Sequence, residues 1–259
     1  MDTLKMLPER YGIPPMEDLL LAAPRMDVQI CLVVIHTICW FFLVNYVFKA
    51  IAISIIRNLQ NKERFISFHR DSYKKILGMD IGANEEEEIE FIAEGEGTIT
   101  QHGIGGSLCL PSALGFGYLF PTGIASAMAC HGSLTEIGTE VEDMLCRVYA
   151  MIYGGEKGRN KSPASLWFFL ICHHSVACLL VIPMNVFYGH NSYYHEMSMW
   201  LQLAAFLAFM IQQYGYLLDI KTAKGLMEMK MSVAIAWVII VWTRVVRYFW
   251  LCKILFDVL

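Results

Sequence analysis

Apolar residues along the chain gather in long runs that are separated by shorter charged segments. The clearest run covers residues 165–189 and contains no Lys, Arg, Asp or Glu. A helix of about 20 apolar residues, rising ~1.5 Å per residue, crosses the ~30 Å hydrocarbon core of a bilayer. The pattern therefore predicts an all-α, polytopic membrane protein.

Six spans are expected when helices with one polar face are counted together with the wholly apolar ones. Pro111 and Pro121 predict that the second span is broken or kinked. The third span has an acidic first half and also fits a soluble amphipathic helix, but a membrane helix facing the bundle interior gives an even number of spans. The expected spans are residues 28–56, 106–130, 134–153, 165–189, 194–218 and 231–255.

These spans divide the chain into four parts. Residues 1–27 form an N-terminal tail, residues 28–56 the first transmembrane helix, residues 57–105 an extramembrane loop, and residues 106–259 the remaining five helices. The loop is basic and amphipathic at first, which predicts an interfacial helix over residues 57–80. Four consecutive glutamates follow, and such a run predicts a solvated loop.

Composition supports the membrane assignment. Hydrophobic residues make up 56% of the chain and charged residues 17%, whereas about 25% of a typical soluble domain is charged. The net charge is −4 and no basic patch carries interleaved aromatics, so we expect no nucleic-acid partner. Residues 57–105, 154–164 and 219–230 are the basic segments, which the positive-inside rule places toward the cytoplasm, matrix or stroma. We expect an integral protein of the endoplasmic reticulum or another organelle membrane, such as the mitochondrial inner membrane.

Two adjacent histidines, His173 and His174, lie at the centre of the most apolar span, between Cys172 and Cys178. A polar side chain at mid-bilayer is costly unless it finds partners inside the protein. Neighbouring side chains point about 100° apart on a helix, so we expect one imidazole to face the bundle interior and the other a neighbouring helix. The same angle scatters the thiols and imidazoles, so we expect no metal site and no cofactor.

Charged residues in other spans are candidate partners for these imidazoles. Glu140 and Asp143 lie on one helical face, and Arg244 lies well inside the last span, where it needs an anion. We expect these groups and the histidines to share one polar pocket. Three roles stay open for that pocket: structural pairing, lipid binding, or catalysis with His173 or His174 as a general base.

The order of motifs resembles the TLC domain, which ceramide synthases and translocating-chain-associating membrane proteins share. The resemblance covers residues 107–256 and rests on three features. One is the histidine pair within residues 172–185, the second is the acidic and serine pair Glu196 and Ser198, and the third is Arg244. It implies a bundle of six helices around a membrane-embedded cavity.

The chain departs from the ceramide synthases of that family at two points. It lacks the second acid after Glu196, and Ala177 stands where a threonine is expected after the second histidine. The resemblance is therefore to a non-synthase member that binds or handles a membrane lipid without covalent chemistry. The residues expected to contact the lipid are His173, His174, Asn185, Glu196, Ser198, Arg244, Asp143 and Glu140.

Two other functions stay open on sequence grounds. One is an accessory structural subunit of a large respiratory or photosynthetic membrane complex, in which the bundle serves as a lipid-filled spacer. The other is a lipid N-acyltransferase of the ceramide-synthase type, which would need a tunnel to His173 or His174 and a second catalytic acid beside it.

Overall fold

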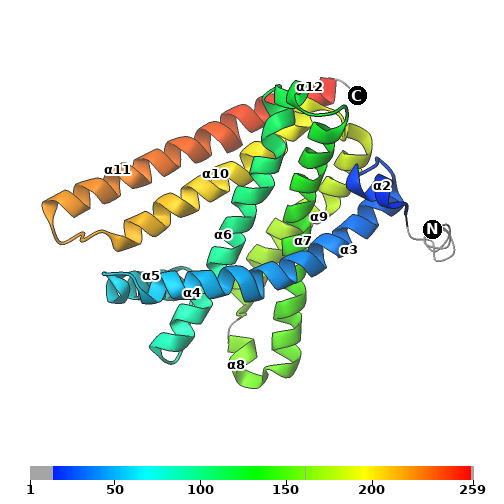
Figure 1. Cartoon of the computed structure of the whole chain (residues 1–259). Helices are drawn as coiled ribbons and strands as arrows, with labels where there is room; N and C mark the ends of the chain where they lie inside the picture. Colours follow the sequence, from blue (N-terminus) through cyan, green and yellow to red (C-terminus); the bar gives the residue numbers. More distant parts are fainter. Residues whose placement is uncertain (1–13, 161, 258–259) are drawn as a thin grey trace.

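The computed structural model describes residues 14–160 and 162–257, apart from the side chains of Lys157, Asn160, Ser165, Phe169, His173 and Val176. This part of the chain is built from helices and contains no strand, which confirms the all-α prediction (Figure 1). The helices are α2 (Met16–Leu20), α3 (Met26–Phe42), η1 (Leu43–Phe48), α4 (Lys49–Arg57), α5 (Lys62–Leu77), α6 (Glu85–Ala113), η2 (Phe116–Leu119), α7 (Ile124–Tyr153), α8 (Gly155–Asn160), α9 (Ala164–Tyr188), α10 (Ser192–Leu217), α11 (Ala223–Ile240), η3 (Val241–Arg247) and α12 (Tyr248–Asp257).

Three helical segments are long and apolar enough to cross a membrane: Met26–Arg57, Leu166–Tyr188 and Ala223–Asp257. The first joins α3, η1 and α4, and the third joins α11, η3 and α12. In both, the middle element is a π-helical turn, which holds more residues per turn than an α-helix. Within the described residues, these three segments have the length and apolarity that the prediction of membrane-spanning helices requires. The helices α6, α7 and α10 are comparably long but too polar to be identified by length and apolarity alone.

Helix α6 is the central element of the arrangement. It packs against α10, α7 and α4, and α7 packs in turn against α3 and α9. Figure 1 shows α6, α7 and α9 running side by side, the continuous helix α3–α4 crossing them, and α10 and α11 forming a long hairpin. The polar faces of α6, α7 and α10 therefore meet in the interior.

The segment after α4 is more ordered than its charge pattern predicts. A helix, α5, lies within the expected residues 57–80, but the acidic run forms the first turn of α6 and not a loop. The side chain of Asn84 caps that helix by accepting from the backbone N–H of Glu87 at 3.1 Å. Carboxylates are stabilising at a helix N-terminus, and Glu85 also pairs with Lys62 of α5 at 2.6 Å.

The expected second span, residues 106–130, is two helices and a turn. Helix α6 ends at Ala113 and α7 begins at Ile124. The turn includes Gly115 and Gly123, whose φ angles of 76° and 85° lie in the left-handed region that glycine adopts without strain. The predicted break is therefore a complete reversal, and α7 takes up both the end of this span and the whole of the third.

Glycine permits the close approach of α6, α7 and α10. A Cβ atom added to Gly105 of α6 would lie 1.9 Å from Oε1 of Gln202 and 2.2 Å from Oγ1 of Thr135. A Cβ atom added to Gly132 of α7 would lie 2.5 Å from the carbonyl oxygen of Gly105. Small residues at such crossings bring backbones together in membrane bundles.

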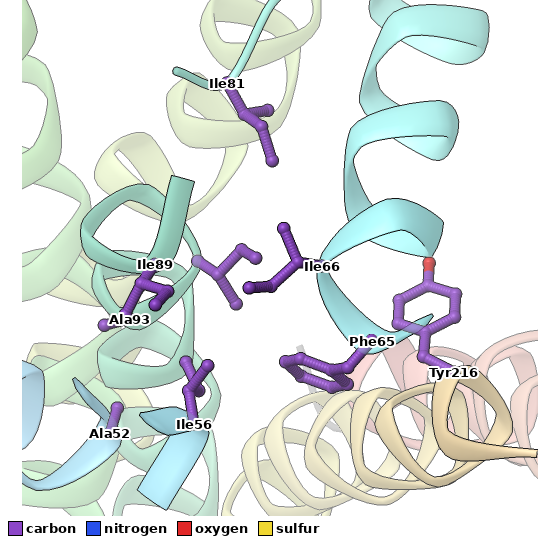
Figure 2. Close-up of a cluster of buried hydrophobic side chains, with 9 residues drawn as sticks. Ala52, Ile56, Phe65, Ile66, Ile81, Ile89, Ala93 and Tyr216 are labelled. Atoms are coloured by element: carbon purple, nitrogen blue, oxygen red, sulfur yellow. The ribbon is translucent and has the colours of Figure 1, made fainter. Parts of the chain in front are cut away.

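One hydrophobic cluster joins α4, α5, α6 and the end of α10 (Figure 2). We call it the α5 cluster; its buried members are Ala52, Ile56, Phe65, Ile66, Ile81, Ile89, Ile92, Ala93 and Tyr216. His69 lies beside it, 5% exposed, with Nε2 2.9 Å from Oε1 of Gln213. Burial lowers the pKa of His69 from 6.5 to about 4.

Candidate functional site

A groove of about 330 Å³ lies between α7 and α9. Its walls are mainly aliphatic, and four polar side chains of different chemistry, a carboxylate, an imidazole, a hydroxyl and a thiol, lie among them. We call it the α7–α9 groove; its lining residues are Glu140, Val141, Met144, Leu145, Val148, Ile171, His174, Ser175 and Cys178.

Helical spacing explains why these residues meet. Glu140, Met144 and Val148 are four residues apart on α7, so their side chains lie above one another on one face. On α9, His174 and Cys178 are likewise four apart. Packing of the two faces brings Sγ of Cys178 to 3.9 Å from Oε2 of Glu140, where the thiol donates to the carboxylate.

Each polar group of the groove has a definite environment. Glu140 is 6% exposed, whereas His174 and Cys178 are half-buried. The Ser175 hydroxyl donates to the carbonyl oxygen of Ile171 within α9. The other expected histidine, His173, belongs to α9, but its side chain lies outside the described part of the structure.

The other expected site residues do not join this groove. Asp143 pairs with Arg147 one turn further along α7, at 2.8 Å. Asn185 is fully buried, donates to Oε1 of Gln29 at 2.9 Å, and accepts from the hydroxyl of Tyr194 at 2.7 Å. Asn185 therefore ties α9 to α3 and α10.

Glu196 forms a salt bridge at the start of α10. Both of its oxygens accept from Arg247, each at 2.7 Å, and Oε1 also accepts from Nε1 of Trp200 at 3.1 Å. The guanidinium of Arg247 lies over the ring of Trp250, 4.4 Å from its centroid. This group joins the last helix to α10.

Arg244 has a different partner from the anion expected for it. Its NH2 group donates to the carbonyl oxygen of Leu201 at 2.7 Å. Its Nε atom is buried and has no hydrogen-bond partner among the described residues. The expected single pocket is thus divided. Glu140 and His174 lie in the groove, Asp143 forms an ion pair within α7, and Asn185, Glu196, Ser198 and Arg244 form separate interhelical contacts.

Ser198 belongs to a buried polar seam between α6, α7 and α10. Ser133 donates to Ser198 at 3.0 Å. Further along, Nε2 of Gln101 lies 2.9 Å from Oγ1 of Thr135 and 3.1 Å from Oε1 of Gln202. These partners satisfy one another, so the seam holds the helices together.

Sequence reasoning missed most of this seam. The mixed composition of residues 89–106 predicts a loop. The contacts that Gln101 and His102 make with α7 and α10 are therefore not predicted from the sequence. The available signal is the spacing of Gln101, Gly105, Cys109 and Ser112, which recur at three or four residues and so lie on one helical face.

Within the described residues, no three His, Cys, Asp or Glu side chains lie close enough to hold a metal ion. The groove instead combines hydrogen-bonding groups with an aliphatic wall, which suits an amphipathic organic ligand. No protein-family model matches the chain, and comparison with curated proteins and solved structures also finds no significant match.

Proposed function

We propose that the chain is an integral membrane protein with six spans in a TLC-like bundle, and that it binds a membrane lipid in the α7–α9 groove. The six spans are α3–α4, α6, α7, α9, α10 and α11–α12. Each has 25 residues or more, which at ~1.5 Å per residue exceeds the ~30 Å hydrocarbon core.

Contacts at the two ends of the bundle support six crossings. Arg64 of α5 lies 3.3 Å from Asp219, in the turn between α10 and α11. At the other end, Ser112 of α6 bonds to His195 of α10 at 2.6 Å, and Asn185 bonds to Gln29. If only the three most apolar segments crossed, α5 and the turn at Asp219 would lie on opposite sides of the membrane.

The observation that carries the lipid proposal is the composition of the groove. Four polar side chains, those of Glu140, His174, Ser175 and Cys178, lie in the groove, and the walls around them are Val141, Met144, Leu145, Val148 and Ile171. A lipid presents the same combination, a polar head on hydrocarbon chains. The groove volume of about 330 Å³ is within the range of ligand sites, roughly 300–1,000 Å³.

The groove favours binding over acyl transfer. An acyltransferase of the kind considered above needs a second acid beside the histidine. The neighbouring acids on the polar face of α7 are Glu136 and Asp143. Glu136 pairs with His102 and Asp143 with Arg147, and neither of them lines the groove. Glu140 is the single carboxylate among the lining residues.

Native mass spectrometry of the full chain, extracted in mild detergent, tests the proposal. Val148→Phe fills the groove and His174→Ala removes a polar contact, so both variants should carry less co-purified lipid per protein than the parent. Val238→Phe is the matched control, because Val238 is 68% exposed on α11, away from the groove. Unchanged lipid content in both groove variants would contradict the proposal, and partner subunits in the spectra would favour the accessory-subunit alternative.

A further inference from the structure

The contact between η3 and α10 holds more positive than negative charge. Arg244 and Arg247 both reach α10 from the π-helical turn η3. Arg247 binds both oxygens of Glu196 at 2.7 Å, whereas Arg244 forms no ion pair with any described residue. Two guanidiniums thus share one carboxylate, and one positive charge has no counter-ion. We propose that the phosphate of an anionic phospholipid binds at Arg244, at a site separate from the α7–α9 groove.

The hydrogen bonds of Arg244 leave its charge unbalanced. Its NH2 group donates to the carbonyl oxygen of Leu201 at 2.7 Å, and its Nε atom is buried without a hydrogen-bond partner among the described residues. A carbonyl oxygen is a neutral acceptor, and the segment that carries Arg244 is apolar enough to cross a membrane. An unpaired guanidinium is costly in such surroundings, so an anion that reaches it is bound favourably.

The acids that the sequence suggests as partners for Arg244 are all held elsewhere. Glu196 is bound by Arg247 and also accepts from Nε1 of Trp200. Glu140 lines the α7–α9 groove, and Asp143 pairs with its own neighbour on α7. The counter-ion of Arg244 therefore has to come from outside the chain.

Aromatic side chains indicate that this contact lies near the lipid head groups of one leaflet. Trp200 bonds to Glu196, and the ring of Trp250 lies under the guanidinium of Arg247, with 4.4 Å to its centroid. Trp250 is 47% exposed, and Tyr193, at the start of α10, is 41% exposed. Trp and Tyr gather at the head-group level of membrane proteins. Lipid phosphate is the anion that is abundant at this level.

The chemistry of the guanidinium suits a phosphate. Arg244 is half-buried, and Leu201 accepts from one of the five N–H donors that a guanidinium carries. Phosphate oxygens commonly accept from arginine in pairs, so a phosphate adds hydrogen bonds as well as negative charge. The nearby carboxylate of Glu196 does not prevent this, because Arg247 already neutralises it.

Binding titrations of the full chain in detergent, read by native mass spectrometry, test the inference. The probes are a phosphatidylglycerol, the phosphatidylcholine with the same acyl chains, and inorganic phosphate. We expect the phosphatidylglycerol to bind about tenfold more tightly than the phosphatidylcholine, whose head has no net charge. Arg244→Gln should remove about that factor, which corresponds to one charge-assisted contact. Equal binding of the two lipids to the parent would overturn the inference, even if the variant failed to fold.

Arg25→Gln is the matched control, because it removes the same charge from an arginine that Asp18 and Asp27 already neutralise, at 2.7 and 2.6 Å. Phosphatidylglycerol binding that is weakened in Arg244→Gln and kept in Arg25→Gln supports the inference. Equal weakening in both variants would assign the preference to net charge and overturn it. Displacement of the lipid by inorganic phosphate would make free phosphate the ligand. Binding that is lost in Val148→Phe and kept in Arg244→Gln would place the phospholipid in the α7–α9 groove.

Discussion

His69 shows how a single residue makes the extramembrane end of the protein sensitive to pH. It belongs to α5, outside the three most apolar segments, and its ring packs against Phe65 and Tyr216 with centroids 4.7 Å apart in each case. In this environment the neutral imidazole is favoured, and its Nε2 donates to Gln213. Protonation therefore opposes the packing of the α5 cluster.

The folded protein should lose stability as the pH falls from 6.5 toward 4. In the unfolded chain His69 takes up its proton near pH 6.5, and in the folded chain only near pH 4. The stabilising effect of the neutral, buried imidazole is therefore complete above pH 6.5. Between pH 6.5 and pH 4, this single group lowers the free energy of unfolding by about 3 kcal/mol. Thermal unfolding in detergent at a series of pH values measures it. His69→Gln should flatten the dependence and His190→Gln, at an exposed position, should not; equal slopes in the two variants would contradict this assignment.

The two arginines of the last helix show what the sequence can and cannot predict about single residues. The sequence predicts that Arg244, inside an apolar helix, needs an anion, and Glu196 is one of its candidate partners. The residue that reaches Glu196 is Arg247, whereas Arg244 bonds to a backbone carbonyl. Both arginines belong to the π-helical turn η3. Such a turn changes which side chains share a face, so α-helical periodicity alone does not give the correct pairing.

At the scale of elements, α6 is the helix whose placement the sequence predicts least well. Its first turn holds four glutamates, which in isolation indicate solvent. The Asn84 cap and the ion pairs with α5 make the same residues a helix start, but those ion pairs join positions far apart in the chain. By contrast, α9, the segment Met26–Arg57 and the segment Ala223–Asp257 are predicted from local apolarity, because each contains a long run with few charged residues.

Two glycines of α6 should respond in opposite directions to the same substitution. Gly105→Ala should destabilise the bundle by about 1–3 kcal/mol, because the added methyl overlaps Gln202 and Thr135. Gly95→Ala should stabilise it by up to ~1 kcal/mol, because a Cβ there meets nothing within 4 Å and alanine favours the helix. Thermal unfolding of the two purified variants tests this, and equal effects would show that α6, α7 and α10 do not meet as closely as described.

At the scale of the whole molecule, contacts between distant segments organise the two ends of the bundle. Arg64 meets Asp219 at one end, and His195 meets Ser112 at the other. The sequence does not predict the position of the α6–α7 turn, because the expected spans 106–130 and 134–153 do not correspond to α6 and α7. Proline and glycine mark several possible breaks in residues 106–130, and packing against α10 selects among them.

Cysteine labelling can decide between six crossings and three. With the native cysteines replaced, Lys75→Cys, Tyr118→Cys and Lys221→Cys each place one reactive thiol at an exposed position. Six crossings require Lys75 and Lys221 on one side of sealed vesicles and Tyr118 on the other. With three crossings, Lys75 and Tyr118 would lie on one side of the membrane and Lys221 on the other. An impermeant maleimide distinguishes these patterns.

The π-helical turn η3 also fixes the rotation of α12 about its axis. Leu251 and Leu255, which follow it, are 0% and 6% exposed. Removing one residue from Val241–Arg247 would restore α-helical phase and turn every later side chain by about 100°. The two leucines would then turn toward the outer surface, and Cys252 and Phe256 would take their buried places. A one-residue deletion in this turn is therefore a far larger change for the protein than most substitutions on the same helix.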